Sequence, residues 1–114
     1  MARVRLSGPA QADLSDILTT SIQRWGHESG QRYATLLISA IRSVAANPEG
    51  PLTHSREEVA KGLRSFHIRH TKTDSTRKHV RNPVHVLFYR MAEPGLVEIV
   101  RVLHERMEPS RHLG

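Results

Sequence analysis

The fold is decided by residues 86–103, which read VLFYRMAEPGLVEIVRVL. β-Branched, aromatic and leucine side chains dominate 84–90 and 97–103, a composition typical of β-strands. Between them, Glu93-Pro94-Gly95 has the residue types that form tight turns. We therefore expect two antiparallel strands joined by a turn over 91–96.

The sequence just before this hairpin predicts one more strand. Residues 64–69 alternate so that Phe66 and Ile68 face the same way, which indicates a strand with one buried face. The connection from 71 to 83 is long, polar and basic, and we expect it to be a flexible protrusion, because hairpin loops of this length are uncommon without a purpose. Residues 49–62 are rich in proline, glycine and charge and are expected to form a surface loop.

Two helices are predicted in the first half of the chain. Apolar residues recur there at spacings of three and four, which places them on one helical face. In the first helix these are Leu14, Ile17, Leu18, Ile22 and Trp25. In the second, over about 28–46, they are Tyr33, Leu37, Ala40, Ile41 and Val44. Ser7 or Gly8 can cap the first helix, Pro9 suits its first turn, and Gly26 is placed to end it. The short connection predicts an antiparallel helical hairpin.

A short strand at residues 2–6, where arginine alternates with apolar side chains, completes the order β-α-α-β-β-β. We predict a single α+β domain over 1–114, in which the helical hairpin packs on one face of a small antiparallel sheet. The last strand is apolar on both faces, with Val97, Ile99 and Leu103 on one face and Val100 and Val102 on the other. The second face needs a cover, either the C-terminal tail or a bound protein.

The positive charge is concentrated in one segment. The chain of 114 residues has 17 Lys+Arg, 11 Asp+Glu and a net charge of +6. Residues 61–90 alone contain eight basic residues and Asp74 as the one acidic residue, which gives +7. Such a segment attracts nucleic acid or an acidic protein partner, although it can also be a solubilising surface.

The composition argues against several classes of protein. The absence of cysteine excludes disulfides, thiolate zinc sites and thiol catalysis. No apolar run is long enough to cross a bilayer and no secretion signal is visible, so we expect a cytoplasmic protein without membrane contact. Eight histidines invite a metal interpretation, but they lack a metal-ligand spacing, and we expect neither metal nor cofactor.

A metal-free ribonuclease remains open on residue type. His104, Arg106 and Arg111 near the C-terminus, together with Arg64 and Arg69, are groups that can move protons and stabilise phosphate. The alternative is that these charges are solvated side chains at the sheet edge and that His104 only closes the last strand.

The order of the motifs resembles the RelE/ParE toxin superfamily, and the ParE side in particular. The fragments are LSGPAQADLSDI, RWG, a second helix ending in NP, GLRSF, VLFYR and VEIVRVLHERMEPSRHL. The C-terminal fragment, 97–113, is the most specific. The resemblance implies the toxin of a type II toxin–antitoxin module, a growth inhibitor that acts on DNA gyrase or a related topoisomerase and meets nucleic acid only indirectly. It also implies a ParD-like antitoxin whose disordered C-terminal part folds onto the toxin.

The resemblance also indicates site residues, without assigning their individual roles. The tail pattern LH-x-RM-x-P-x-RHL carries over His104, Arg106, Met107, Pro109, Arg111, His112 and Leu113. For contacts with the target or the antitoxin we select Arg64, Arg69, Arg90, His104, Arg106, Met107, Arg111 and His112. The antitoxin is expected to cover the apolar face of Val100 and Val102. No catalytic residue is assigned.

The alternative within the superfamily is a RelE-like toxin that cuts mRNA in the ribosome. Members of that branch use basic residues and usually a tyrosine near the C-terminus. The tail of this chain has no tyrosine and contains Glu105 and Glu108, which argues against nuclease chemistry. A second departure from the family is the basic 71–83 insertion, where typical members turn tightly.

Overall fold

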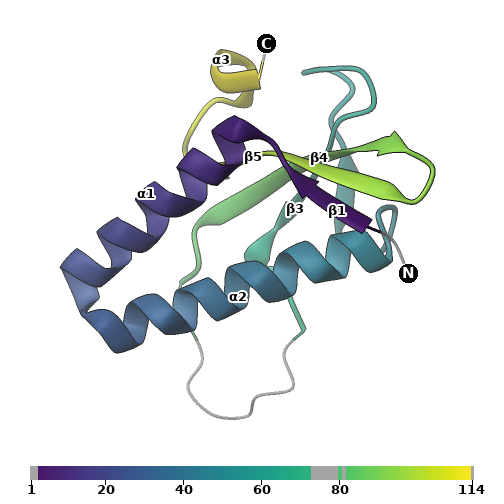
Figure 1. The fold of residues 1–114 in the computed structure, drawn as a ribbon. Coiled ribbons are helices and arrows are strands. Elements are labelled where there is room, and N and C mark those ends of the chain that lie inside the picture. Colours follow the sequence, from purple (N-terminus) through teal and green to yellow (C-terminus); the bar gives the residue numbers. More distant parts are fainter. Residues whose placement is uncertain (1–2, 73–79, 81, 114) are drawn as a thin grey trace.

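Two long helices lie side by side on one face of a five-stranded sheet in this computed structural model, which describes residues 3–72, 80 and 82–113 (Figure 1). The elements follow the order β1 (Arg3–Leu6), α1 (Gly8–Trp25), α2 (His27–Ala46), β2 (Thr53–Ser55), β3 (Arg64–His67), the 3₁₀ turn η1 (Ile68–His70), β4 (His85–Glu93), β5 (Leu96–His104) and α3 (Pro109–Leu113). The predicted α+β fold, with a helical hairpin on a sheet, is confirmed. None of the helices in the described ranges is both long and apolar enough to cross a membrane.

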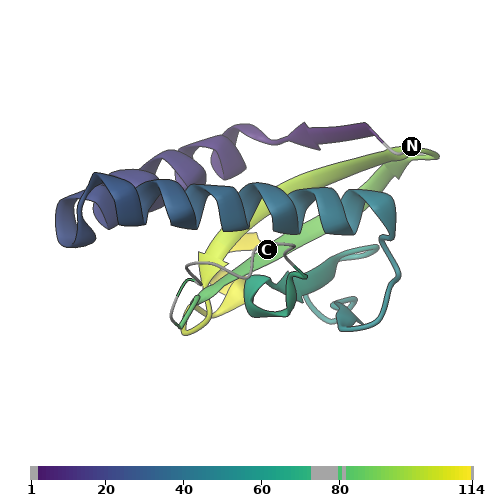
Figure 2. The ribbon, with the colours of Figure 1, turned by 90° about the horizontal axis from the view of Figure 1, so that it is seen from below.

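The sheet is mixed, with the strand order β1-β5-β4-β3-β2. The pairs β2–β3, β3–β4 and β4–β5 are antiparallel as expected, whereas β1 pairs parallel to β5. A parallel pair requires a long crossover, and the α1–α2 hairpin lies within that connection. Figure 2 shows both helices crossing the same side of the sheet.

Two local expectations need correction. Residues 53–55, expected within a surface loop, form strand β2 and pair with residues 64–66 of β3. The strand expected over 64–69 ends at His67, because residues 68–70 turn into η1. Residues 53–55 carry no apolar alternation, whereas the alternation of Phe66 and Ile68 continues past His67 and therefore does not mark the start of η1. Most of the 71–83 insertion, including Arg77, Lys78 and Arg81, lies outside the described residues.

The helical hairpin is fixed by its ends. The Ser7 hydroxyl accepts a hydrogen bond from the Ala10 N–H at 3.0 Å and donates to the Val100 carbonyl at 2.7 Å, so one side chain caps α1 and joins it to β5. Gly26, at φ +90°, separates α1 from α2 with a backbone conformation that a side chain would disfavour. At Gly30 the helices approach so closely that an added Cβ would meet Ile22 Cγ1 at 2.5 Å.

The main core lies between the helices and the sheet. The expected face of α2 is buried throughout, from Tyr33 at 8% exposed to Ala40 at 0%. The prediction of a buried face on α1 is correct only for its first part. Leu14, Ile17 and Leu18 pack against this core. Ile22 and Trp25 are instead 38% and 64% exposed. The last turn of α1 therefore extends beyond the sheet.

A half-buried ion pair fixes the first half of α1 to β5. Arg101 donates to both carboxylate oxygens of Asp13, at 2.7 and 2.8 Å, and the Val102 N–H donates to the same carboxylate at 2.9 Å. Arg101 also donates to the His112 carbonyl of α3 at 3.2 Å. The hydrogen bonds to Asp13 raise the pKa of Arg101 further. One arginine thus joins a helix, a strand and the tail.

Candidate functional site

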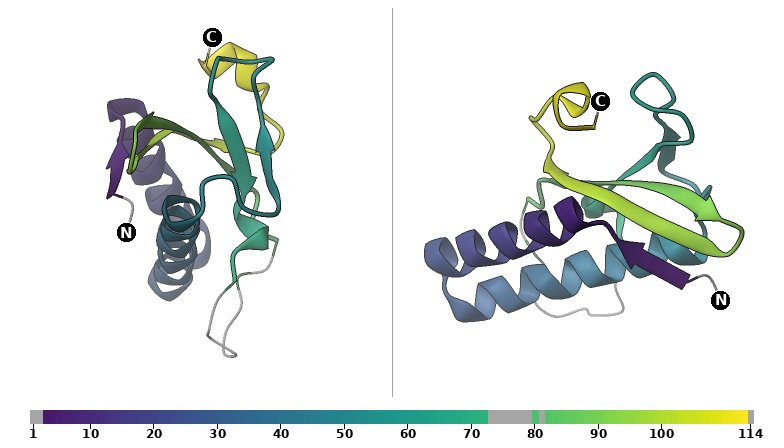
Figure 3. Two further views of the ribbon diagram at one scale, coloured as in Figure 1. Left: turned by 90° about the vertical axis from the view of Figure 1, so that its right-hand side faces the viewer. Right: turned by 45° about the horizontal axis from the view of Figure 1, so that its top comes forward.

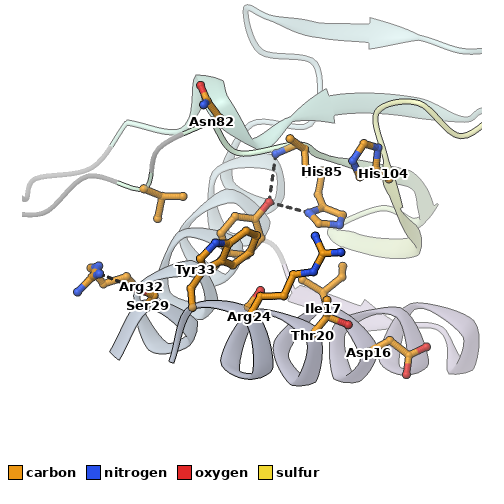
Figure 4. Close-up of a pocket in the computed structure, with 14 residues that line it drawn as sticks. Asp16, Ile17, Thr20, Arg24, Ser29, Arg32, Tyr33, Asn82, His85 and His104 are labelled. Carbon is orange, nitrogen blue, oxygen red and sulfur yellow. Dashed lines mark hydrogen bonds between the residues drawn. The ribbon is translucent and has the colours of Figure 1, made fainter. Parts of the chain in front are cut away.

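A pocket opens where the far half of α1 extends past the end of the sheet (Figure 4). It has a volume of about 840 Å³ and is lined by residues of α1 and α2, by the start of β4 and by the end of β5. Ligand pockets of small-molecule size fall in this range of volume. No pattern in the sequence predicted this pocket.

Tyr33 forms the buried wall of the pocket. Its hydroxyl lies 2.6 Å from His85 Nδ1 and 3.2 Å from the Val84 backbone nitrogen. Both contacts are satisfied when the hydroxyl accepts from Val84 N–H and donates to Nδ1. In that arrangement the ring proton of neutral His85 is on Nε2, because Nδ1 is the acceptor. Burial raises the pKa of Tyr33, so the hydroxyl keeps its proton.

His85 is held neutral at physiological pH. Burial lowers its pKa to about 4, and the neighbouring imidazoles of His104 and His67 act in the same direction, against weaker effects of Asp13 and Glu105. The His104 ring stands edge-on to His85 with ring centroids 5.8 Å apart. His104 Nδ1 accepts a hydrogen bond from the Arg106 N–H at 3.1 Å, which leaves Nε2 to carry the proton of a neutral ring. Both imidazoles therefore carry their proton on Nε2 when neutral, and both residues line the pocket.

The open side of the pocket is formed by exposed and half-buried residues of the helical hairpin. Arg24 and Trp25 come from the last turn of α1, and Ser29 and Arg32 come from the first turns of α2. Arg32 is held by Ser29 at 2.8 Å and by Glu28 at 3.4 Å. The side chain of Arg24 instead extends across the pocket towards His85 (Figure 4). This arrangement combines cationic and N–H donor groups with one exposed aromatic ring.

The tail residues that the sequence analysis selected are mostly exposed. Arg106, Met107, Arg111 and His112 lie on the surface beyond β5, and Met107 is 46% exposed. His104 is half-buried and lines the pocket, although the backbone N–H groups of Arg106 and Met107 both donate to it, at 3.1 and 2.9 Å. The structure thus divides the tail set between the pocket and the exposed end of the chain.

The selected arginines of the sheet have different environments. Arg64 is half-buried and donates to the Pro48 carbonyl at 3.1 Å and to the Thr53 hydroxyl at 2.8 Å. It therefore helps to hold β2 and the end of α2 in place. Arg90 pairs with Glu98 at 2.9 Å across the β4–β5 hairpin, whereas Arg69 is exposed in η1. Any binding role of these three residues stays a prediction.

The basic segment does not gather on one surface within the described residues. Lys61 lies in the β2–β3 connection, whereas Arg69 and Lys72 lie at or just after η1, at the opposite end of β3 (Figure 3). A run of charge that is continuous in sequence is therefore split along the length of a strand.

The predicted division of β5 into two apolar faces is wrong at Val102 and Leu103, which exchange faces, and the second face is partly covered by the chain itself. A β-bulge leaves Val100 unpaired, since Phe88 is opposite Arg101 and Tyr89 is opposite Ile99. The extra residue turns Val102 into the main core, at 3% exposed, so Val102 is not available to a partner. The face away from the helices instead contains a small cluster of Leu63, Phe88 and Leu103, against which Val59, Ala60, Val86, Val100 and Leu113 pack. Figure 3 shows α3 and the β2–β3 connection on this side of the sheet.

Two pairs of histidines are in ring contact, His67 with His70 and His85 with His104, but in the described part of the chain no group of three or more potential ligands is placed to hold a metal ion. His67 Nε2 lies 2.7 Å from Glu105, which joins the end of β3 to the residues after β5. The His67 and His70 ring centroids are 6.3 Å apart.

Sequence reasoning missed Tyr33, His85, Arg24 and Trp25 as a group. They come from three elements, and Tyr33 and His85 are 52 positions apart. Tyr33 fits the apolar stripe of its helix, and Trp25 fits the stripe of α1, so periodicity assigns both to the core. The one signal that could have found the pocket is the arginine next to a tryptophan at a helix end.

The comparisons with known proteins agree with one another. Residues 4–109 match the family model described as "ParE toxin of type II toxin-antitoxin system, parDE". The chain is 33% identical over 112 residues to Toxin ParE1 of Mycobacterium tuberculosis, with 98% of each chain covered. It is 37% identical over 114 residues to Toxin ParE1 of Caulobacter vibrioides, with 100% of each covered. A solved structure titled "Chromosomal ParDE TA system from P. aeruginosa" has a TM-score of 0.64 at 15% identity, covering 91% of this chain and 96% of that one.

Proposed function

From the premise that the chain belongs to the family of ParE toxins of type II toxin–antitoxin systems, we propose that it inhibits DNA gyrase or a related type II topoisomerase in the cytoplasm and is neutralised by a ParD-like antitoxin. The observation that carries the proposal is the extent of the family match, which runs from β1 to the start of α3 and includes the tail residues Arg106 and Met107. Inhibition of gyrase is what the resemblance of the motifs to ParE-type toxins implies.

The tail is the part of the toxin that we assign to the target. Arg106 and Met107 lie in the turn after β5, and both side chains are exposed. An exposed cation beside an exposed, adaptable thioether is suited to contact with another protein. Neither side chain is needed to complete the core, so both can be changed without loss of the fold.

Gyrase supercoiling with purified toxin tests this assignment. We expect the toxin to abolish supercoiling and to leave cleaved DNA, and we expect the double variant Arg106→Ala, Met107→Ala to lose this inhibition at unchanged Tm. Arg42→Ala, which alters an exposed arginine of α2 outside the pocket, is the matched control and should inhibit normally. Unchanged supercoiling and uncut DNA at micromolar toxin would reject gyrase as the target.

Induction of the chain in cells tests the RelE-like alternative. Primer extension on translated mRNA after induction is expected to show no codon-phased cuts. Codon-phased cuts that disappear in the His104→Ala or Arg106→Ala variant would show that the toxin cleaves mRNA, and would contradict the proposal of topoisomerase inhibition.

For the antitoxin, we propose that its acidic segment contacts the basic side chains at one end of β3. Arg69 and Lys72 are both exposed there. Because exposed charges are screened by salt, the affinity should fall as ionic strength rises. We expect Arg69→Glu to weaken binding by about tenfold, mainly through the association rate, whereas Lys61→Glu at the other end of β3 should have little effect. Equal effects of the two variants in a titration would place the antitoxin elsewhere.

A further inference from the structure

The pocket beside Tyr33 is lined by several charged and ionisable side chains that the fold does not need for its core. Five charged or ionisable side chains line it besides the tyrosine: Asp16, Arg24, Arg32, His85 and His104. Arg32 is occupied by Glu28 and Ser29, and Asp16 is exposed on the α1 side. The remaining three are donors.

These three donors lie at the same end of the pocket. The Arg24 side chain extends towards His85, and the rings of His85 and His104 are in edge contact (Figure 4). Each imidazole has its Nδ1 engaged, by the Tyr33 hydroxyl and by the Arg106 N–H respectively, so the proton of each neutral ring is on Nε2, which can donate to a ligand. The guanidinium of Arg24 together with the N–H groups of two imidazoles is the kind of donor set that binds a phosphate.

The other notable lining residue is Trp25. It is 64% exposed, although an indole is among the largest apolar side chains, and it lines the same pocket. An exposed indole beside a cationic site offers a surface on which a planar base can stack. The pocket volume of about 840 Å³ leaves room for both parts of such a ligand.

We propose that this pocket binds a mononucleotide, with its phosphate on Arg24, His85 and His104 and its base stacked on Trp25. The site goes beyond toxin activity and does not rest on it, because the side chains that we assign to the topoisomerase, Arg106 and Met107, do not line the pocket. His104 is oriented by the backbone N–H of Arg106, which a change of the Arg106 side chain keeps. Since Asp16 is the carboxylate at the rim, it opposes the anion and limits affinity.

Trp25 is the single tryptophan of the chain, so its fluorescence reports directly on the pocket. We expect AMP to quench this fluorescence saturably, and adenosine to do so only at concentrations about tenfold higher or more, because it lacks the phosphate. Inorganic phosphate alone should shift the His85 and His104 resonances in NMR spectra without quenching Trp25.

Matched variants locate the ligand within the pocket. Arg24→Gln should weaken AMP binding by about tenfold or more, whereas Arg42→Gln on α2 should leave it unchanged. Asp16→Asn should tighten binding, because it removes the opposing charge. All three side chains are exposed, so each variant is expected to fold, and circular dichroism checks this.

Three outcomes would overturn the proposal. The first is no quenching by AMP at millimolar concentration. The second is equal affinity for AMP and adenosine with no effect of Arg24→Gln. The third is binding of a single-stranded oligonucleotide that depends on Arg24 while AMP does not bind, which would make the surface a nucleic-acid contact. None of these measurements uses gyrase or antitoxin, so their failure is separate from failure of the proposed function.

Discussion

The two halves of α1 differ in how their polar side chains are paired. In the first half, Asp13 neutralises Arg101 with two hydrogen bonds, and the charges are largely shielded from water. In the second half, Arg24 and Trp25 project over an open pocket in which His85 and His104 supply N–H donors. The same helix therefore provides stability at one end and free binding groups at the other. Complete pairing of polar groups marks the structural end, and incomplete pairing marks the candidate binding end.

The largest effect is expected from breaking the structural end. Asp13→Asn removes the charge that neutralises Arg101 and weakens the bond from Val102 N–H, so the free energy of unfolding should fall by about 2–3 kcal/mol. Chemical denaturation measures this change. The control is Asp16→Asn, one turn further along the same helix and exposed, which should change stability by less than about 0.5 kcal/mol. Equal losses in the two variants would mean that the ion pair has no special role.

A smaller effect comes from protonation at the pocket end. The pKa of His85 is about 4 in the folded chain, whereas an unfolded histidine has a pKa near 6.5. The unfolded state therefore binds more protons between these values, and stability should fall as pH is lowered from about 6.5 to about 4, with no contribution above that window. Because His85 is only partly buried, we expect a loss of about 1–2 kcal/mol.

Thermal denaturation as a function of pH measures this loss. His85→Gln should flatten the pH dependence in that window, because glutamine can still accept from the Tyr33 hydroxyl but does not titrate. His27→Gln, at the exposed start of α2, serves as control and should retain the slope. A slope unaltered by His85→Gln would assign the acid sensitivity to another group.

The smallest effect is expected for an ion pair that belongs to neither end. Arg3 and Glu93 are 2.9 Å apart, and their side chains are 68% and 57% exposed. Surface pairs of this kind contribute little, so Arg3→Gln should change the free energy of unfolding by less than about 0.5 kcal/mol. A loss as large as that of Asp13→Asn would show that exposure does not distinguish the two ion pairs.

The elements with strong local patterns could be predicted from the sequence. The stripe from Tyr33 to Val44 and the existence of a turn between the last two strands carry their own signals, and both were confirmed. The turn is shorter than the expected 91–96, because β4 continues to Glu93 and β5 begins at Leu96, which leaves Pro94 and Gly95 between them. Strand β2 was missed because Thr53, His54 and Ser55 carry no apolar alternation. The face of Val102 was wrong because the bulge at Val100 shifts the alternation by one residue, and a bulge leaves no mark in an apolar run.

The candidate site was less predictable because it depends on contacts between distant residues. Asp13 and Arg101 are 88 positions apart, and the pocket joins α1, α2, β4 and β5. The tail motif found from the resemblance gave His104, which does reach the pocket, together with Arg106 and Met107, which do not line it. Their roles at the target and the antitoxin stay predictions.

The most direct test of the central claim, that this chain is an active ParE-type toxin whose target contacts lie in the exposed tail, is growth after induction. We predict that induction of the wild-type chain alone stops growth, that co-expression of the cognate antitoxin restores it, and that the double variant Arg106→Ala, Met107→Ala permits growth while accumulating as a folded protein. Unimpaired growth on induction of the wild-type chain, at a level of folded protein equal to that of the variant, would contradict the account.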